Sequence, residues 1–152
     1  MSYSLDTSAL LDAWVRYYPP DVFGTLWKKF ETLIEEGRFL VIDEVLREIK
    51  RKDDDVSKWV KTRSGMIVPL QASIQTRATQ IINQFPSLTQ SGGMMQGAAD
   101  PFVIALAVER DLMVVTGEHS KPSKPRIPDA CKTLGIKCGS MVDLFRAEGW
   151  NV

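Results

Sequence analysis

Short, mostly apolar runs alternate along the chain with longer segments in which apolar residues recur every three or four positions. The short runs are typical of strands buried on both faces, and the three-and-four spacing is typical of helices with one buried face. The strand-like runs lie at residues 3–5, 39–42, 66–69, 112–115 and 136–138. Strands that alternate with helices predict a parallel sheet with right-handed crossovers, and therefore an α/β fold.

The helical segments have recognisable ends. Prolines at residues 19–20 stop the first helix, Gly37 ends the second, and Asp43 is placed to cap the third. Thr7 or Ser8 is expected to cap the first. Helices are expected after residue 7, over residues 23–36, 44–52, 73–85, 99–111 and 128–134, and at the carboxyl end of the chain. Residues 53–63 predict a solvated helix, or a helix and a loop.

The size and charge of the chain limit its organisation. At 152 residues and 44% hydrophobic content, it can bury a core without stabilising disulfides or metal ions, so we expect one domain over residues 1–152. Lysine and arginine total 19, as do aspartate and glutamate. The charge of the whole molecule therefore draws it to neither nucleic acid nor membranes, and any contact with a polyanion must come from local basic patches.

The cysteines and the apolar runs indicate a compartment. Cys131 and Cys138 fit neither a zinc-ligand spacing nor a disulfide framework, so we interpret them as small buried hydrophobic residues in a reducing environment. No signal-peptide pattern precedes Asp6, and no apolar run approaches the roughly 20 residues of a membrane span. The expected location is cytoplasmic, without membrane contact.

Four acidic residues stand at the ends of the apolar segments. Asp6 closes the first strand, and Glu44 lies in the first turn of the helix after the second. Asp100 opens the helix before the fourth strand, and Glu118 follows that strand. If the first strand is central, with the second and fourth beside it, these carboxylates meet at the edge where open α/β sheets bind ligands. Clustered carboxylates repel one another unless a cation is present, and an all-oxygen site suits Mg²⁺ or Mn²⁺.

Each acid also has a structural alternative. Asp6 and Asp100 can cap helices, and Glu44 can interact favourably with a helix dipole. Capping does not explain why all four acids face one crevice, nor why Thr116 and Glu118 interrupt a Val-Val strand. Taken together, the four residues therefore favour a metal site.

Four stretches, LDTSALLDAW, VIDEVLREI, AADPFVIALA and VVTGEH, follow one another over nearly the whole chain. In that order and at those separations they resemble the PIN-domain ribonucleases, which include the VapC-like toxins of bacterial and archaeal toxin–antitoxin pairs. No one stretch is specific alone, whereas the ordered set is. The resemblance implies a three-layer α/β/α PIN-like fold with a central parallel sheet in the order 3-2-1-4-5.

The resemblance also implies roles for the acids. Asp6, Glu44 and Asp100 would hold Mg²⁺ or Mn²⁺, and Glu118 would complete the pocket where the family more often has Asp. The extra methylene of Glu118 leaves open whether it binds the ion directly or through water. The family implies an endoribonuclease that cleaves single-stranded RNA, leaves a 5′-phosphate and a 3′-hydroxyl, and is held inactive by a small antitoxin in its groove.

Other polar residues are candidates for supporting roles. Ser8 and Thr116 can orient a ligand carboxylate or a water molecule, with capping or a turn as the equal alternative. Glu48, one turn beyond Glu44, can reach the outer shell of the metal, but we rather expect an ion pair with Lys52 or Arg51.

The loop after Glu118 is basic. Lys121, Lys124 and Arg126 alternate there with prolines, and phosphate binding competes with plain solvation as their role. His119, the single histidine, is interpreted as an exposed bystander. The loop GGMMQG lacks the GK[ST] ending of a phosphate-binding loop, so we interpret it as a flexible connection.

Aromatic residues near the N-terminus are a candidate interaction surface. Trp14, Tyr17, Tyr18 and Trp27 can contact an antitoxin or a second copy of the chain in a homodimer, although core packing is the favoured role of the tryptophans.

Two further function classes remain open. A Mg²⁺-dependent phosphohydrolase acting on small phosphate esters usually needs a second acid two residues after its nucleophilic Asp, and here Ser8 takes that place. A catalytically silent PIN-like module that binds RNA or protein has no need of four intact acids. The leading hypothesis is therefore the metal-dependent endoribonuclease.

Overall fold

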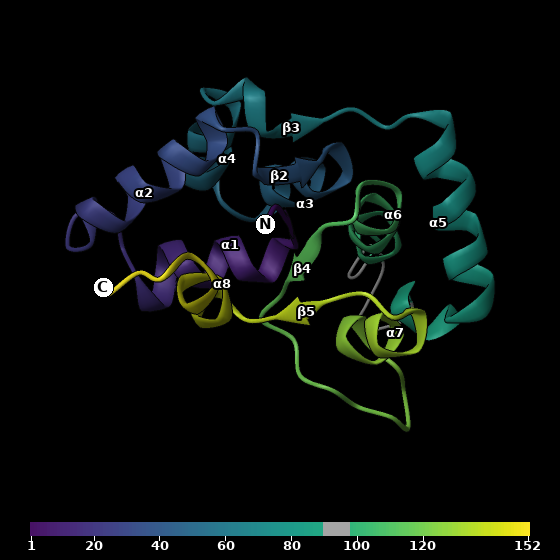
Figure 1. Cartoon of the computed structure of the whole chain (residues 1–152). Coiled ribbons are helices and arrows are strands. Elements are labelled where there is room, and N and C mark those ends of the chain that lie inside the picture. The colour runs from purple at the N-terminus through teal and green to yellow at the C-terminus, as the bar shows by residue number, and fades with distance from the viewer. Residues whose placement is uncertain (90–97) are drawn as a thin grey trace.

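The computed structural model describes residues 1–89 and 98–152, and its centre is a five-stranded parallel sheet (Figure 1). The strands are β1 (Tyr3–Leu5), β2 (Phe39–Ile42), β3 (Ile67–Val68), β4 (Met113–Val115) and β5 (Cys138–Gly139). Their order is β3-β2-β1-β4-β5, and every neighbouring pair is parallel, so the predicted order is confirmed. The loop GGMMQG, for which we expect a flexible connection, lies outside the described residues.

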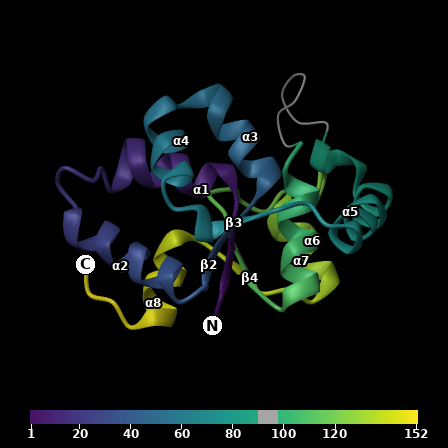
Figure 2. The same cartoon turned by 90° about the horizontal axis from the view of Figure 1, so that it is seen from above.

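Helices cover both faces of this sheet, which confirms the predicted three layers (Figures 1 and 2). One layer contains α1 (Thr7–Asp12), α2 (Gly24–Glu35) and α8 (Met141–Glu148), and the other contains α5 (Ala72–Gln84), α6 (Asp100–Arg110) and α7 (Ile127–Leu134). α3 (Asp43–Lys52) starts at the carboxyl end of β2, contacts α1 and is followed by α4 (Asp54–Lys61). Two short 3₁₀-helices are also present: η2 (Ser64–Met66) precedes β3, and η3 (Pro86–Thr89) follows α5.

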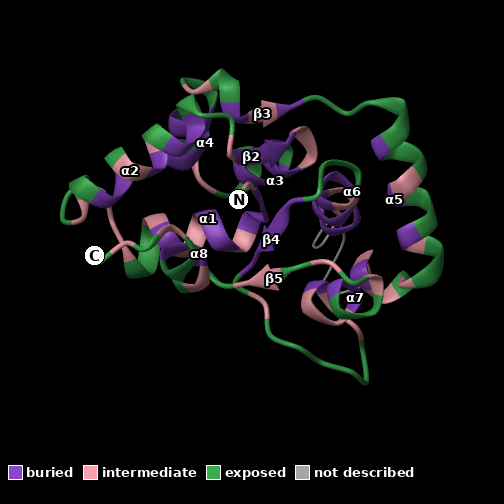
Figure 3. Cartoon of the chain, in the orientation of Figure 1, coloured by how far each residue is buried: buried purple, intermediate pink, exposed green. Residues whose placement is uncertain are grey.

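The three inner strands, β2, β1 and β4, are buried because helices pack on both of their faces, and the edge strands β3 and β5 are partly buried (Figure 3). Trp27 of α2 packs edge-to-face against Phe30 and Trp59, with ring centroids 5.0 Å and 4.9 Å apart. Trp27 therefore belongs to the core, as favoured from the sequence. Trp59 buries one face of α4, so the prediction of a solvated helix at residues 53–63 is wrong in that respect.

The first helix changes its hydrogen-bonding pattern after α1. Ala13–Tyr17 form a π-helix, η1, which the Tyr18 amide closes by donating to the Ala13 carbonyl at 2.8 Å. Trp14 packs on the tryptophan of α2 at 5.0 Å, whereas Tyr17 is 60% exposed. Single π turns inside helices are rare and are frequent at functional sites. The apolar spacing of the sequence did not predict this turn.

Two predicted helix caps are wrong. The N-cap of α3 is Ile42, and Asp43 lies at the first position inside the helix without a capping hydrogen bond. α1 is capped by the carboxylate of Asp6, and neither Thr7 nor Ser8 takes that position. In both places the helix begins directly at the end of a strand, earlier than the capping pattern indicated.

Two further expectations concern the thiols and the membrane. Cys131 is a buried free thiol, as predicted, and Cys138 is a free thiol that is only partly buried. Across residues 1–89 and 98–152, no helix combines the length and the apolar character needed to cross a membrane.

Candidate metal centre

Asp6 stands between β1 and α1, at the middle of the sheet's carboxyl edge. Its Oδ1 accepts hydrogen bonds from the amide and hydroxyl of Ser8, the latter at 2.7 Å, and from the Ala9 amide at 3.2 Å. Its Oδ2 accepts a hydrogen bond from the hydroxyl of Thr116. Asp6 is only 1% exposed, so these donors from two elements hold its carboxylate in one orientation. It caps α1 and faces the crevice at the same time.

Asp100 and Glu118 approach Asp6 from neighbouring elements. Asp100 is the first residue of α6, and Glu118 follows β4. One carboxylate oxygen from each of the three residues lies within 4.8 Å of the others. Three of the four predicted ligands are thus brought together although they are far apart in the sequence.

The three carboxyl groups resist ionisation in this arrangement. Burial, together with the charges of Asp6 and Glu118, raises the pKa of Asp100 to about 10. Burial also raises the pKa of Asp6, against the opposing effect of its hydrogen bonds. The pKa of Glu118 is raised by burial and by the charge of Asp6. Fully ionised, the cluster would therefore carry more negative charge than its surroundings stabilise.

Glu44 does not join this cluster, and Glu48 lies closer to it. Glu48 is 4% exposed and accepts a hydrogen bond from the Ala99 amide at 2.7 Å, directly before Asp100. Burial raises the pKa of Glu48, and the charge of Asp6 adds to that rise. Glu44 is partly exposed in the first turn of α3. Both residues lie on the same side of α3, and the helix presents Glu48 to the start of α6.

The predicted ion pair of Glu48 is wrong. Within the two described segments, neither Lys52 nor Arg51 forms an ion pair with it. The reason is the orientation of α3, because Glu48 faces inward while Arg51 and Lys52 are exposed. Glu48 instead fixes the start of α6.

Ser8 and Thr116 connect the ends of the two central strands. The Thr116 hydroxyl donates to Asp6 and accepts a hydrogen bond from the Glu118 amide at 3.0 Å. The Ser8 hydroxyl donates to Asp6 and accepts from the Gly117 amide at 3.0 Å. Both side chains therefore contact the cluster and the loop that carries Glu118.

Gly117 passes very close to α1. A Cβ at this position would lie 2.9 Å from the Oδ2 of Asp12 and 3.2 Å from the Oγ of Ser8. The loop after β4 can approach the first helix this closely because the residue has no side chain.

The basic loop is closed by the carboxylate of Asp129, in α7. Its Oδ2 accepts hydrogen bonds from the amides of Lys121 and Arg126 at 2.8 Å and 2.9 Å. Its Oδ1 accepts from the hydroxyl of Ser120 at 2.5 Å. The two ends of the loop are thus joined through one side chain.

The basic side chains lie at different distances from the acids. Lys121 and Lys124 are exposed, and Arg126 is half-buried. The charge of Arg126 opposes the rise in the pKa of Glu118, so it lies within electrostatic reach of the cluster. His119 is exposed, as the bystander interpretation predicts, and it lines the groove described next.

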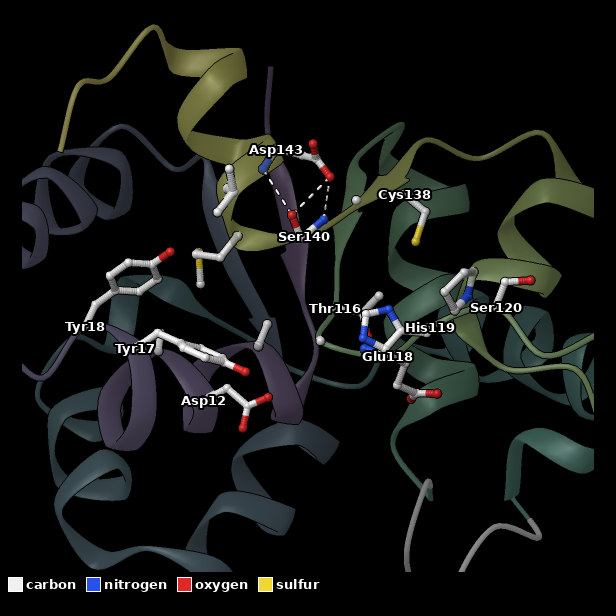
Figure 4. Close-up of a pocket in the computed structure, with 17 residues that line it drawn as sticks. Asp12, Tyr17, Tyr18, Thr116, Glu118, His119, Ser120, Cys138, Ser140 and Asp143 are labelled. Atoms are coloured by element: carbon white, nitrogen blue, oxygen red, sulfur yellow. Dashed lines mark hydrogen bonds between the residues drawn. The ribbon is translucent and has the colours of Figure 1, made fainter.

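A groove of about 500 Å³ begins at Glu118 and runs past α1 and η1 to the amino end of α8 (Figure 4). Asp12 and Tyr17 lie on one side of it, and His119 lies on the other with Glu118. Ser140 closes a third side at the start of α8. Glu118 therefore belongs both to the carboxylate cluster and to the groove.

Two acids near the site are not among the residues predicted from the sequence. Asp12 stands one helical turn after Ser8, and this four-residue spacing places both on the side of the helix that meets the loop after β4. Asp129 stands at the third position of α7, where a carboxylate can accept hydrogen bonds from backbone amides that precede the helix. Both signals are present in the sequence, but each is common in helices without any site.

The cluster fits a hard divalent cation. Its donors are all carboxylate oxygens, which Mg²⁺ and Mn²⁺ prefer, and their raised pKa values show that positive charge is lacking. Oxygens on opposite sides of one Mg²⁺ lie roughly 4.2 Å apart. The observed separation of up to 4.8 Å needs only a small contraction to hold an ion.

Comparisons with known proteins agree with this fold. No curated protein matches the chain. Among solved structures, it is similar to a chain in the crystal structure of VapBC2 from Rickettsia felis bound to a DNA fragment from their promoter, with a TM-score of 0.52 and 14% identity over 92% of this chain and 98% of that one. This likeness and the sheet order establish a PIN-like α/β/α fold. A family model matches residues 3–152, and the chain belongs to that family, which is described as a domain of unknown function, DUF4411.

Proposed function

We propose that this chain is a metal-dependent endoribonuclease that cleaves single-stranded RNA. The observation that carries the proposal is the cluster of Asp6, Asp100 and Glu118, whose oxygens lie within 4.8 Å of one another in a largely buried setting. Carboxylates so arranged destabilise a fold unless a cation joins them, so their presence favours a functional site. The PIN-like fold and the family resemblance of the four sequence stretches support nuclease chemistry at this site.

Asp6, Asp100 and Glu118 would hold one or two Mg²⁺ or Mn²⁺ ions. When bound, such ions lower the pKa of a water molecule and stabilise the charge that develops on the scissile phosphate. Ser8 and Thr116 keep the carboxylate of Asp6 in one orientation, so that it need not reorganise during the reaction.

Glu48 positions the cluster from the other side. Its carboxylate holds the Ala99 amide, and Asp100 is the next residue. In this proposal Glu48 takes the supporting role and Glu44 has none, because Glu44 stands outside the cluster.

The burial of the cluster favours a single-stranded substrate. Asp6 is 1% and Asp100 8% exposed, so a phosphate must come close to the sheet edge to reach them. A flexible single strand can bend into such a site, whereas a duplex is stiffer. Lys121, Lys124 and Arg126 would bind the neighbouring phosphates without reading bases.

We further propose that the chain is the toxin of a toxin–antitoxin pair, and that a small antitoxin covers its groove. The support is the likeness to a chain of the VapBC2 complex and the need of any cell to restrain a ribonuclease. Co-expression with the product of the neighbouring gene tests this part, since a stable complex with reduced RNA cleavage is expected. Size-exclusion chromatography of the isolated chain tests the homodimer.

The principal experiment measures cleavage of single-stranded RNA by matched variants. Asp100→Asn should lower the Mn²⁺-dependent rate by at least about 100-fold, because it removes a ligand charge and keeps the side-chain shape. Asp111→Asn is the control at the other end of α6, where the residue has a positive φ of 55° that asparagine adopts readily. It should cleave like the parent.

Other outcomes would point to other functions. Cleavage that survives Asp100→Asn or excess EDTA would exclude this cluster as the catalytic site. Metal-dependent hydrolysis of p-nitrophenyl phosphate without RNA cleavage would favour a phosphohydrolase. RNA binding without any hydrolysis would favour a silent binding module.

A further inference from the structure

The groove beside the cluster is unsuited to phosphate. Within the described part of the chain, its lining includes no lysine or arginine but does include the acids Asp12, Glu118 and Asp143. A phosphate would be repelled there, whereas a nucleoside is neutral and carries N–H and O–H donors. Because Glu118 is shared by the cluster and the groove, RNA held at the cluster would bring a nucleoside next to its phosphate to the groove.

An exposed aromatic ring lines the groove, and the aromatic ring next to it is packed in place. Tyr17 lines it and is 60% exposed (Figure 4). The ring of Tyr18 lies 6.2 Å from that of Tyr17 and is itself held between Phe23, at 5.5 Å, and Phe145, at 5.3 Å. Nucleobases stack on exposed aromatic rings of this kind.

Of the two groove acids that lie outside the carboxylate cluster, Asp12 and Asp143, only Asp12 has acceptor capacity to spare. Asp143 accepts hydrogen bonds from the amide and hydroxyl of Ser140 and from the guanidinium of Arg146. Asp12 accepts no hydrogen bond from any residue in 1–89 or 98–152, and its ion pair with Arg16 is long, at 3.8 Å. That arginine side chain is 71% exposed, so it screens the carboxylate weakly.

We propose that the groove binds a guanine base of the single-stranded RNA, with Tyr17 stacked on the base and Asp12 accepting its N1–H and 2-amino hydrogens. This inference rests on the proposed ribonuclease function and specifies the part of the substrate that is recognised. A carboxylate offers two acceptors and no donor. Guanine presents two adjacent N–H donors on its Watson–Crick edge, whereas adenine and cytosine place a ring acceptor beside their amino group and uracil places carbonyls on both sides of its N–H.

The size of the groove suits this ligand. Pockets that bind small molecules measure roughly 300–1,000 Å³, and this groove measures about 500 Å³. Its π turn, η1, sets Tyr17 outward while Trp14, in the same turn, packs inward. A regular α-helix continued through Tyr17 would rotate that ring away from its present position.

The test measures binding of guanosine, adenosine, cytidine and uridine by NMR titration in EDTA. Guanosine should bind most tightly. Tyr17→Ala should weaken guanosine binding about tenfold, and Tyr17→Phe should retain it, because stacking needs the ring and not the hydroxyl. Asp12→Asn should abolish the preference for guanosine, because the amide has one acceptor and adds a donor. Val22→Ala, a 70% exposed residue outside the groove lining, is the control and should bind like the parent.

Equal binding of the four nucleosides, or parental guanosine binding by Tyr17→Ala and Asp12→Asn, would overturn the proposal. Nucleosides carry no phosphate and EDTA removes divalent ions, so the result is independent of metal binding and of RNA cleavage. Guanosine binding in a protein that does not cleave RNA supports the groove and contradicts the nuclease. RNA cleavage without guanosine preference contradicts the groove and leaves the nuclease standing.

Discussion

The carboxylates at the two ends of the parallel strands differ in whether a positively charged side chain pairs with them. At the amino edge, Glu148 of α8 accepts a hydrogen bond from the Tyr3 hydroxyl and pairs with the Arg38 guanidinium, both at 2.5 Å. At the carboxyl edge, the three carboxylates of the metal centre form no ion pair with any lysine or arginine in the described segments. The Glu148 carboxylate has its counter-charge within the fold, whereas the three carboxylates at the other edge have none there and are compatible with a cation from solution.

The same difference appears in the protonation of the two edges. Burial and the hydrogen bond to Glu148 raise the pKa of Tyr3, so its hydroxyl stays a donor and the network is complete. At the other edge, raised carboxyl pKa values mean that the metal-free protein lowers its charge by taking up protons. The network at the amino edge is therefore complete, whereas the carboxyl edge holds protonated carboxyl groups that are compatible with the binding of a cation in place of protons.

Removal of Glu148 should have the largest effect on stability. Glu148→Ala leaves the half-buried Arg38 without its main partner and should lower the free energy of unfolding by about 3 kcal/mol, measured by urea denaturation. Glu36→Ala is the control, since it removes the other, 44% exposed, partner of Arg38 and should cost less than about 1 kcal/mol. Equal losses of unfolding free energy in the two variants would contradict the view that Glu148 is the main partner of Arg38.

Divalent ions should stabilise the carboxyl edge by a slightly smaller amount. At a hundredfold excess over its Kd, Mn²⁺ should add about 2.7 kcal/mol to the free energy of unfolding, because it binds the folded state only. Thermal melts with Mn²⁺, Mg²⁺ and EDTA measure the shift. Asp100→Asn should abolish it and Glu148→Ala should keep it. A melting temperature that neither ion nor chelator changes would contradict the metal centre.

The pH dependence of metal-free stability is the next effect. The unfolded chain loses the Asp100 proton near its ordinary pKa of 3.8, and the folded protein keeps it until about pH 10. Between these values the folded state binds the extra proton, so the free energy of unfolding falls as pH rises, by up to about 1.4 kcal/mol per pH unit. Urea denaturation at pH 6, 7 and 8 in EDTA should show this slope. It should flatten in Asp100→Asn and persist in Asp111→Asn, and equal slopes in all three proteins would refute the assignment.

The basic loop should have the smallest effect, confined to RNA. Changing Lys121, Lys124 and Arg126 to glutamine should weaken binding of all single-stranded RNAs by a similar factor and reduce the salt slope by about 0.7 for each phosphate that the loop no longer neutralises. Binding titrations at several salt concentrations, with cleavage blocked by EDTA, provide the measurement. The equivalent triple change at Arg47, Lys50 and Arg51 of α3 is the comparison. If that set has the larger effect, the RNA path crosses α3.

Much of the fold could be predicted because its strands are apolar runs with few alternatives. The runs at β2 and β4 contain only buried residues, and acids at the ends of parallel strands must share one edge. The order of the acids along the chain thus located Asp6, Asp100 and Glu118. It could not separate Glu44 from Glu48, because residues four apart share a helix face and only the tilt of α3 against α6 decides which one is buried.

The groove was less predictable than the cluster. Trp14 in the π turn η1 packs on Trp27, which is distant in the sequence, and no local pattern distinguishes Ala13–Tyr17 from an ordinary helical turn. Asp12 has the appearance of a solvent-facing helix residue until the loop after β4 is placed beside it. Sites that lie at the end of a strand are readable from order along the chain, whereas sites between separate elements depend on angles that the sequence does not display.

A substitution at Gly117 would affect the two sites more than the stability of the fold. A methyl group there would meet the Oδ2 of Asp12 at 2.9 Å, which can move away with its side chain, and the Oγ of Ser8 at 3.2 Å, which needs to give by only a few tenths of an ångström. Yet one of these side chains supports Asp6 and the other lines the groove. A change from glycine to alanine would thus disturb both sites in a protein that still melts normally. Selection at this position would act on chemistry alone, without the stability loss that usually exposes a damaging substitution to cellular quality control.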